Sequence, residues 1–170
     1  SKIAVAGPDL QWIGGASGTL VRRYKGVMAT VTVTGLSTDA VNCLAVPYRL
    51  DRRNEVYVGS AGGELYRSVN GTATTPTWAT MITAATGSVD ALAFAEDGSD
   101  YLYIVQTNAT TNSRILRDHS RGYCGNDLEA LTAYTFGANA TLNSIAAPDC
   151  NTFIAVGDVD NSQASIFVGS

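Results

Sequence analysis

The sequence predicts an all-β fold in which four-stranded antiparallel sheets follow one another as the blades of a β-propeller. The first observation is a motif of Ile or Leu followed by Ala that opens four successive units of the 170-residue chain, at spacings of 41, 48 and 53 residues. Repetition at about this period, with several short strands in each unit, is typical of propeller blades. The four copies are Ile3-Ala4-Val5, Leu44-Ala45-Val46, Leu92-Ala93-Phe94 and Ile145-Ala146-Ala147.

The second observation is that the second position of this motif is always the small residue Ala. Three copies share a longer frame, in which Val41-Asn42-Cys43, Val89-Asp90-Ala91 or Leu142-Asn143-Ser144 precedes the motif. Innermost strands converge on the propeller axis, where room is short, so a recurrent Ala suits them. We therefore expect Ala4, Ala45, Ala93 and Ala146 to occupy equivalent, buried positions on successive sheets. A β-sandwich whose strands are similar by accident is the alternative.

The third observation is the series of short apolar runs that follows each motif. An aromatic residue leads the second run of every unit, at Trp12, Tyr57, Tyr103 and Phe153. Third runs follow at 19–21, 64–66, 114–116 and 165–168, and fourth runs at 28–34, 78–82 and 131–136. The runs are rich in β-branched and aromatic residues and are bounded by Gly, Asn, Asp, Ser or Pro, which indicates strands and turns. No sustained helical period is present, so we expect very little helix.

The blade boundaries follow from these runs as 1–37, 38–86, 87–138 and 139–170, all within one domain. The fourth unit has only three runs, which gives about 3.75 blades. We therefore expect either a fragment of a larger propeller of about six to eight blades or an incomplete four-bladed one. The last run, 164–170, contains Ile166-Phe167-Val168 and no Lys or Pro to discourage pairing. We expect its edge to pair with further blades of the same parent chain or with a like subunit.

Composition limits the partners and the compartment. The net charge is −4 and only 15% of residues are charged, so no nucleic-acid partner is expected. No apolar run is long enough to span a membrane. The adjacent pairs Arg22-Arg23 and Arg52-Arg53 are interpreted as solvated turns. Three Asn-x-Thr sequons, at Asn70, Asn108 and Asn139, favour an extracellular, cell-surface or virion-surface glycoprotein, although chance or a prokaryotic or phage origin would make them meaningless.

The three cysteines are expected to differ in role. Cys43 replaces the small residues of its sister blades and is expected to be buried and unpaired. Cys124 lies between the third and fourth strands of blade three, and Cys150 between the first and second strands of blade four. In adjacent meander blades these two loops emerge on one face, so a Cys124–Cys150 disulfide is predicted, with two unpaired thiols as the alternative.

One turn in the second blade resembles a known repeat. Residues 66–72 read Tyr-Arg-Ser-Val-Asn-Gly-Thr, and Thr77-Trp78 follows. This stretch resembles the Asp-box, or BNR repeat, whose usual form Ser-x-Asp-x-Gly-x-Thr-Trp joins the third and fourth strands of a blade. Asn70 stands where Asp is usual, and extra residues precede Thr77. The resemblance covers one blade and implies a sortilin-like or photosystem-assembly-factor-like propeller. It also implies a structural turn in which Asn70 caps backbone groups, built from Ser68, Asn70, Gly71 and Trp78.

No residue pattern indicates catalysis. Sialidases also contain Asp-boxes, but their active sites need an arginine cluster, a Tyr–Glu pair and an acid/base Asp. The spacing of Tyr123 and Glu129 does not establish such a site. The spacing of Arg114 and Asp118 does not establish one either. The only histidine, His119, lies in a polar stretch, and no zinc spacing is present. The stretch 158–161 is a polar hairpin turn or a weak calcium loop. We therefore expect no catalytic residues, no metal and no cofactor.

The sequence thus favours a non-enzymatic propeller module for scaffolding, adhesion or assembly with protein partners. A glycan-binding propeller lectin is the alternative, in which Trp12, Tyr57 and Tyr103 stack on sugars. These aromatics begin predicted second strands, where packing between blades is the stronger expectation. A sialidase-like glycosidase fragment is the third hypothesis.

Overall fold

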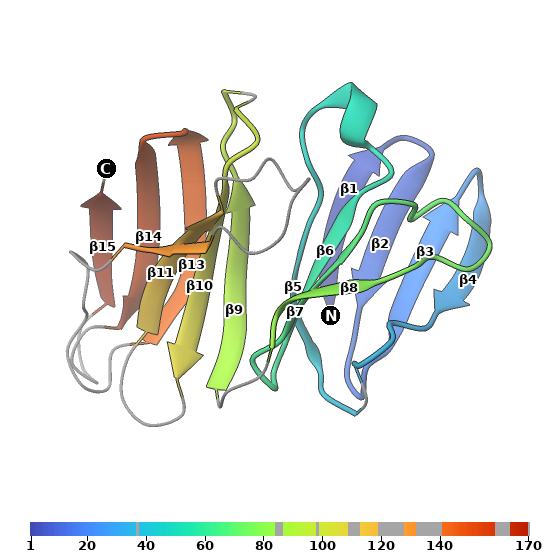
Figure 1. Ribbon diagram of the computed structural model, residues 1–170, viewed down its shortest axis with the longest axis horizontal. Helices are drawn as coiled ribbons and strands as arrows, with labels where there is room; N and C mark the ends of the chain where they lie inside the picture. The colour runs from blue at the N-terminus through green and yellow to red at the C-terminus, as the bar shows by residue number, and fades with distance from the viewer. Residues whose placement is uncertain are drawn as a thin grey trace.

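The computed structural model describes residues 1–36, 38–83, 87–97, 99–108, 113–118, 128–131, 141–158 and 164–169. Within these ranges the chain forms four antiparallel sheets and no α-helix, so the predicted all-β propeller fold of about four blades is confirmed (Figure 1). None of these residues belongs to a helix that is long and apolar enough to cross a membrane.

Each sheet is a meander in which consecutive strands pair. The first sheet contains β1 (Lys2–Gly7), β2 (Leu10–Gly14), β3 (Leu20–Tyr24) and β4 (Val27–Val31). The second contains β5 (Val41–Ala45), β6 (Val56–Ser60), β7 (Leu65–Ser68) and β8 (Ala79–Ile82), with the 3-10 helix η1 (Leu50–Arg52) between β5 and β6. The third contains β9 (Gly87–Phe94), β10 (Leu102–Asn108), β11 (Ser113–Asp118) and β12 (Leu128–Ala130), and the fourth β13 (Thr141–Asp149), β14 (Thr152–Asp158) and β15 (Ala164–Gly169).

One predicted strand lies mostly outside the described residues. The apolar run 131–136 was expected to form the last strand of the third blade, whereas β12 begins at Leu128, and of that run only Leu131 is described. The backbone N–H of Leu131 donates to the carbonyl of Ile115 at 3.0 Å, which continues the pairing of β12 with β11. The outermost strand of the third blade therefore begins three residues before the predicted run, and the prediction for 132–136 stays untested.

The four blades are arranged as an arc. Neighbouring innermost strands pack in chain order, β1 with β5, β5 with β9 and β9 with β13. Among the described residues no comparable contact joins β13 to β1. Figure 1 shows the first and fourth sheets running from innermost strands near the middle of the molecule toward opposite ends. Each end of the arc therefore presents one sheet face that none of the described blades covers.

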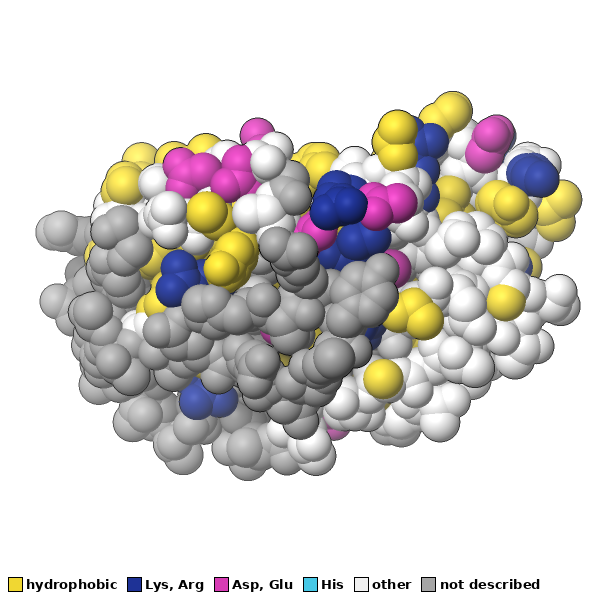
Figure 2. Space-filling model, turned by 45° about the horizontal axis from the view of Figure 1, so that its top comes forward, with side chains coloured by type: hydrophobic (Ala, Val, Ile, Leu, Met, Phe, Trp, Pro, Cys, Tyr) yellow, Lys and Arg dark blue, Asp and Glu magenta, His cyan; other side chains and the backbone are white. Residues whose placement is uncertain are grey.

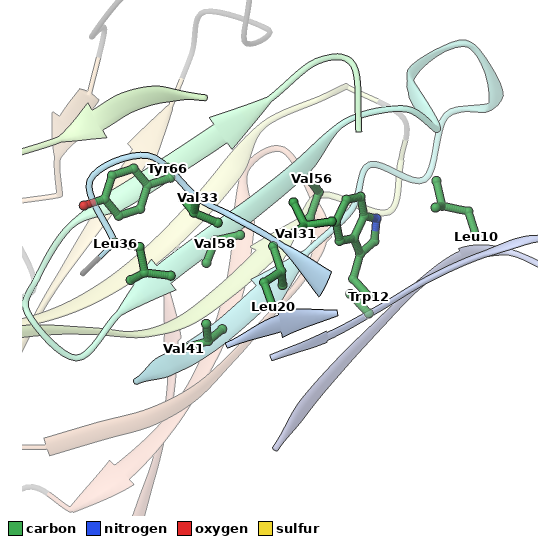
Figure 3. Packing of buried hydrophobic residues seen from close by; sticks show 11 residues of the cluster. Leu10, Trp12, Leu20, Val31, Val33, Leu36, Val41, Val56, Val58 and Tyr66 are labelled. Carbon is green, nitrogen blue, oxygen red and sulfur yellow. The ribbon is translucent and has the colours of Figure 1, made fainter. Parts of the chain in front are cut away.

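We call the side of a sheet that is turned toward the next blade its forward face and the opposite side its rear face. Side chains alternate between the two faces along each strand. Three apolar clusters fill the three junctions between blades, each joining the forward face of one sheet to the rear face of the next. Figure 3 shows the first junction, where Trp12 and Leu20 from the first sheet lie close to Val56 and Val58 from the second.

The alternation of side chains between forward and rear faces explains the recurrent motif of Ile or Leu followed by Ala. Its Ala lies on the forward face, opposite the residue that leads the second strand, in the pairs Ala4–Trp12, Ala45–Tyr57, Ala93–Tyr103 and Ala146–Ile154. The four alanines are therefore equivalent, as predicted. The prediction that all four are buried is wrong, because Ala93 is half-buried and Ala146 is exposed. None of the described blades covers the forward face of the fourth sheet, so Ala146 is exposed there.

The pairing also corrects one alignment. Phe153 is not the equivalent of Trp12, Tyr57 and Tyr103, because Ile154 holds that register position opposite Ala146. Phe153 lies on the rear face of the fourth sheet and is fully buried against the third blade, with its ring centroid 5.6 Å from that of Tyr103. A neighbouring aromatic therefore shifted the sequence alignment by one residue.

Candidate functional site

The forward face of the fourth sheet is an exposed apolar surface. Ile166 and Val168 on β15 are 72% and 68% exposed, and Val156 and Ile154 on β14 are 40% and 37% exposed. Antiparallel pairing sets Ile154 beside Val168 and Val156 beside Ile166. We call this surface the forward end face; its members are Ser144, Ala146, Ile154, Val156, Ile166 and Val168.

The equivalent positions on the other three sheets show that this surface lacks a covering blade. On the other three sheets the position of Ile166 is held by Leu20, Leu65 and Ile115, as the pairing with the second strand establishes. All three are 0% exposed, because the next blade covers them. The fourth sheet therefore keeps the apolar side chain of a blade junction and presents it to solvent.

The opposite end of the arc shows the same relationship on a rear face. Ile3 is 67% exposed and Val5 is 57% exposed. Their equivalents on the second sheet, Leu44 and Val46, are partly buried against the first blade. We call the rear face of the first sheet the rear end face; Ile3, Val5, Ile13, Val21, Arg23 and Met28 belong to it by strand register.

A hollow of about 370 Å³ lies along the innermost strands of all four sheets. Most of its lining residues are apolar, and Tyr48, Arg53 and Glu96 are its larger polar residues. Partial burial, with the negative charge of Glu96, raises the pKa of the 63% exposed Tyr48. Across the described part of the chain no group of three or more His, Cys, Asp or Glu side chains could hold a metal ion. The hollow thus combines small and aliphatic side chains with one acidic residue, Glu96, and one basic residue, Arg53.

A buried ionic network joins the second blade to the third. Arg52, on η1, donates two hydrogen bonds of 2.7 Å to the carboxylate of Glu55 and lies 3.1 Å from a carboxylate oxygen of Asp100. Arg67 on β7 also pairs with Glu55, at 3.0 Å. Burial alone would raise the pKa of Glu55, but the hydrogen bonds and charges of the two arginines lower it below its usual value.

The interpretation of Arg52 as part of a solvated turn is wrong, since only 3% of it is exposed. Arg22 is likewise buried, whereas Arg23 and Arg53 are exposed as expected. The sequence signal for Arg52 is Glu55, three residues later, which can close an ion pair across one short turn. In Figure 2 basic and acidic side chains gather side by side near the middle of the face shown. The network holds two blades together and leaves little free charge for a ligand.

The Asp-box-like turn is built into the junction between the first two blades. The side-chain oxygen of Asn70 accepts hydrogen bonds from the backbone N–H of Thr77 at 2.9 Å and from the hydroxyl of Ser68 at 3.1 Å. Arg22 on β3 donates to the carbonyls of Gly71 and Ala73. The turn of one blade is thus fastened to a strand of the blade before it.

Two aromatic rings complete this junction. Trp78 meets Trp12 edge-on, with ring centroids 6.5 Å apart and an interplanar angle of 77°. A Cβ on Gly71 would lie 2.7 Å from the Trp12 ring and 2.8 Å from the Asn54 carbonyl, so only glycine fits there. The Ser68, Asn70, Gly71 and Trp78 group therefore lies within the framework of the fold.

The three aromatics of the glycan hypothesis cannot stack on sugars in this structure. Trp12, Tyr57 and Tyr103 are 0%, 1% and 1% exposed and lie between blades. The Tyr103 hydroxyl donates to the carbonyl of Cys150 at 2.8 Å, and the Tyr57 hydroxyl belongs to the Arg52–Glu55 network. They contribute to packing, as their position at the start of second strands indicates.

The cysteines and the remaining sequons are only partly described. Cys43 is buried and its thiol donates to the Val89 carbonyl at 3.3 Å; burial raises its pKa. Cys150 lies at the β13–β14 turn and is partly exposed, whereas Cys124 lies outside the described residues, so their disulfide stays a prediction. Asn108 was expected in a loop but ends β10, where its backbone pairs with Gly87. Asn139, His119, Tyr123 and 159–161 also lie outside the described residues, and of Glu129 only the backbone is described.

Comparison with known proteins supports the fold. No protein-family model matches the sequence, and no curated protein matches it. Among solved structures, the fold is similar to the β-propeller domain of Cps50 (Swd1) from Myceliophthora thermophila, with a TM-score of 0.61 and 15% identity over 100% of this chain and 50% of that one. It is also similar to the GH74 xyloglucanase of Xanthomonas campestris, with a TM-score of 0.64 and 12% identity over 94% of this chain and 26% of that one.

A third similar structure is the computationally designed Ika4 protein, with a TM-score of 0.57 and 14% identity over 99% of this chain and 90% of that one. The chain therefore spans half of the Swd1 domain and about a quarter of the xyloglucanase. At these identities the likeness concerns the fold alone. The chain is a β-propeller module of about four blades, and the Asp-box family is not shown by these similarities.

Proposed function

We propose that this chain is a non-enzymatic assembly module whose two end faces pack against further β-sheet of a protein partner. The observation that carries the proposal is Ile166, which is 72% exposed at a repeat position that is fully buried on the other three sheets. Burial of apolar surface is the main favourable term in protein association, so a face of this composition favours a covered state.

Two further features support a role in assembly. The β15 strand pairs with β14 on one side, and Lys and Pro are absent from 164–169, so nothing in that segment discourages pairing along its other edge. Several polar residues that could serve chemistry are instead used between blades, as Arg52 and Arg22 illustrate. Scaffolding or adhesion at an extracellular, cell-surface or virion-surface location accords with the Asn70 sequon, and mass spectrometry of chain secreted by a glycosylating host tests that part.

The assembly role is tested by the association of the purified chain. At micromolar concentration we expect association in sedimentation velocity, and we expect Ile166→Lys to weaken it because the substitution places a charge in the covered face. Leu50→Lys is the matched control, since Leu50 is 70% exposed on η1, away from both end faces. A chain that sediments as a monomer with or without Ile166→Lys would contradict the proposal.

A further inference from the structure

We propose that the partner is a second copy of this chain, and that two copies close one ring of eight blades in head-to-tail order. This inference rests on the proposed function, because it names the occupant of the same two end faces. In the ring, the forward end face of each copy packs on the rear end face of the other.

The shape of the arc fits this arrangement. The end sheets run toward opposite ends of the molecule, so a copy rotated about the axis of the arc meets both of them (Figure 1). The chain aligns over its whole length with 50% of the Swd1 propeller domain, so two copies hold as much chain as that domain. Both new contacts would be the same heterologous interface, which closes into a ring when the rotation between copies allows it.

The end faces use the same repeat positions as the junctions within the chain. At each internal junction a motif Ala on a forward face, such as Ala45, meets a rear face carrying the motif leucine of the next blade, such as Leu92. At the ends the corresponding residues are Ala146 and Ile3, which are both exposed. The second strands supply Ile154 on the forward side and Ile13 on the rear side. A head-to-tail contact therefore repeats the internal junction, with mostly aliphatic side chains on both faces and Arg23 on the rear side.

The charges of the two end blades are opposite. Residues 1–37 contain four Lys or Arg and one Asp, whereas residues 139–170 contain three Asp and no Lys or Arg. On the first sheet Arg23 is exposed on the rear end face, and Lys25 is exposed at the β3–β4 turn. Opposite potentials favour forward-to-rear contact and oppose contact between two like ends. The net charges of the two end blades therefore favour a head-to-tail order over the alternative in which identical faces meet.

The test is the molar mass of the chain and its response to mutations on each end face. Sedimentation equilibrium of the unmodified chain should give twice its 17.8 kDa mass, without larger species. Val156→Lys on the forward end face and Ile3→Lys on the rear end face should each raise the dissociation constant about 100-fold, since a buried unpaired charge is costly. Leu50→Lys should leave the dissociation constant unchanged, within about twofold, the ordinary effect of an exposed substitution.

Mixing the two variants separates a ring from other dimers. A Val156→Lys chain and an Ile3→Lys chain together form a ring in which one interface carries both substitutions and the other carries neither. We therefore expect the mixture to form a heterodimer more tightly than either variant forms a homodimer, as native mass spectrometry of a mass-labelled pair would show. If identical faces met, mixing would restore nothing, and the head-to-tail ring would be overturned.

The outcomes also distinguish this inference from the proposed function. Open polymers that Val156→Lys suppresses would overturn the closed pair and leave the assembly role standing. A chain that stays at 17.8 kDa at all concentrations would overturn both.

Discussion

Ile166 on the fourth sheet and Leu65 on the second occupy the same repeat position, yet Leu65 is 0% exposed and Ile166 is 72% exposed. Each lies opposite the second-strand residue of its own sheet, Val156 for Ile166 and Gly59 for Leu65. The difference comes from the neighbouring blade, which covers Leu65 and is missing over Ile166. The forward face of a sheet in this chain is therefore buried only where another blade packs against it.

Replacing Glu55 by Gln should destabilise the chain strongly. The substitution removes the carboxylate that pairs with both Arg52 and Arg67, and leaves the buried Arg52 partly uncompensated. Breaking a buried ion pair from one side typically costs about 3–5 kcal/mol. Urea denaturation should show this loss, while Asp51→Asn, which alters an exposed partner of Arg49, should leave the unfolding free energy nearly unchanged.

Replacing Gly71 by Ala should disturb the junction of the first two blades. The added methyl would overlap the Trp12 ring and the Asn54 carbonyl, and overpacking of this kind costs about 1–3 kcal/mol. Gly15→Ala is the control, because the nearest atom to its new Cβ lies at 3.7 Å. Equal melting temperatures for the two variants would show that the junction adapts freely.

Replacing Asn70 by Asp should be tolerated, whereas Asn70→Ala should not. The Asn70 oxygen accepts the Thr77 N–H, and Asp retains that acceptor. Losing a side-chain acceptor that caps a backbone N–H costs about 0.5–2 kcal/mol by analogy with helix caps. Thermal denaturation of the two variants compares them directly, and similar losses in both would indicate that the hydrogen bond contributes little.

Asp97 should titrate at unusually low pH. Hydrogen bonds from Ser99, followed by the backbone N–H of Cys150, lower its pKa from 3.8 to about 2. Because the folded-state pKa is the lower one, the stabilisation is present above pH 3.8 and is lost as pH falls toward 2. Carboxyl chemical shifts should give the low pKa directly, and Asp97→Asn should flatten the stability profile in this window. A midpoint near 3.8 in the folded chain would contradict the hydrogen bonding.

The repeated blades could be predicted from the sequence, but the exposure of the fourth sheet at the end of the repeat could not. Spacing and small residues predicted the blades because every junction repeats one pattern of alternate faces, visible at Ala4, Ala45 and Ala93. The exposure of Ala146 could not be predicted this way, since it depends on whether a further blade is present. Arg52 was misread for a similar reason: its burial follows from Asp100, which lies on the next blade and far along the chain.

Hydrogen exchange of β15 as a function of chain concentration tests the central claim most directly. The account predicts that the backbone amides of 166–168 exchange more slowly as the chain concentration rises, and that Ile3→Lys and Val156→Lys each abolish this dependence. Protection of β6, already buried within the arc, should stay constant and serves as the internal reference. Exchange of 166–168 that does not depend on concentration in the unmodified chain would contradict the claim that the forward end face is a packing surface.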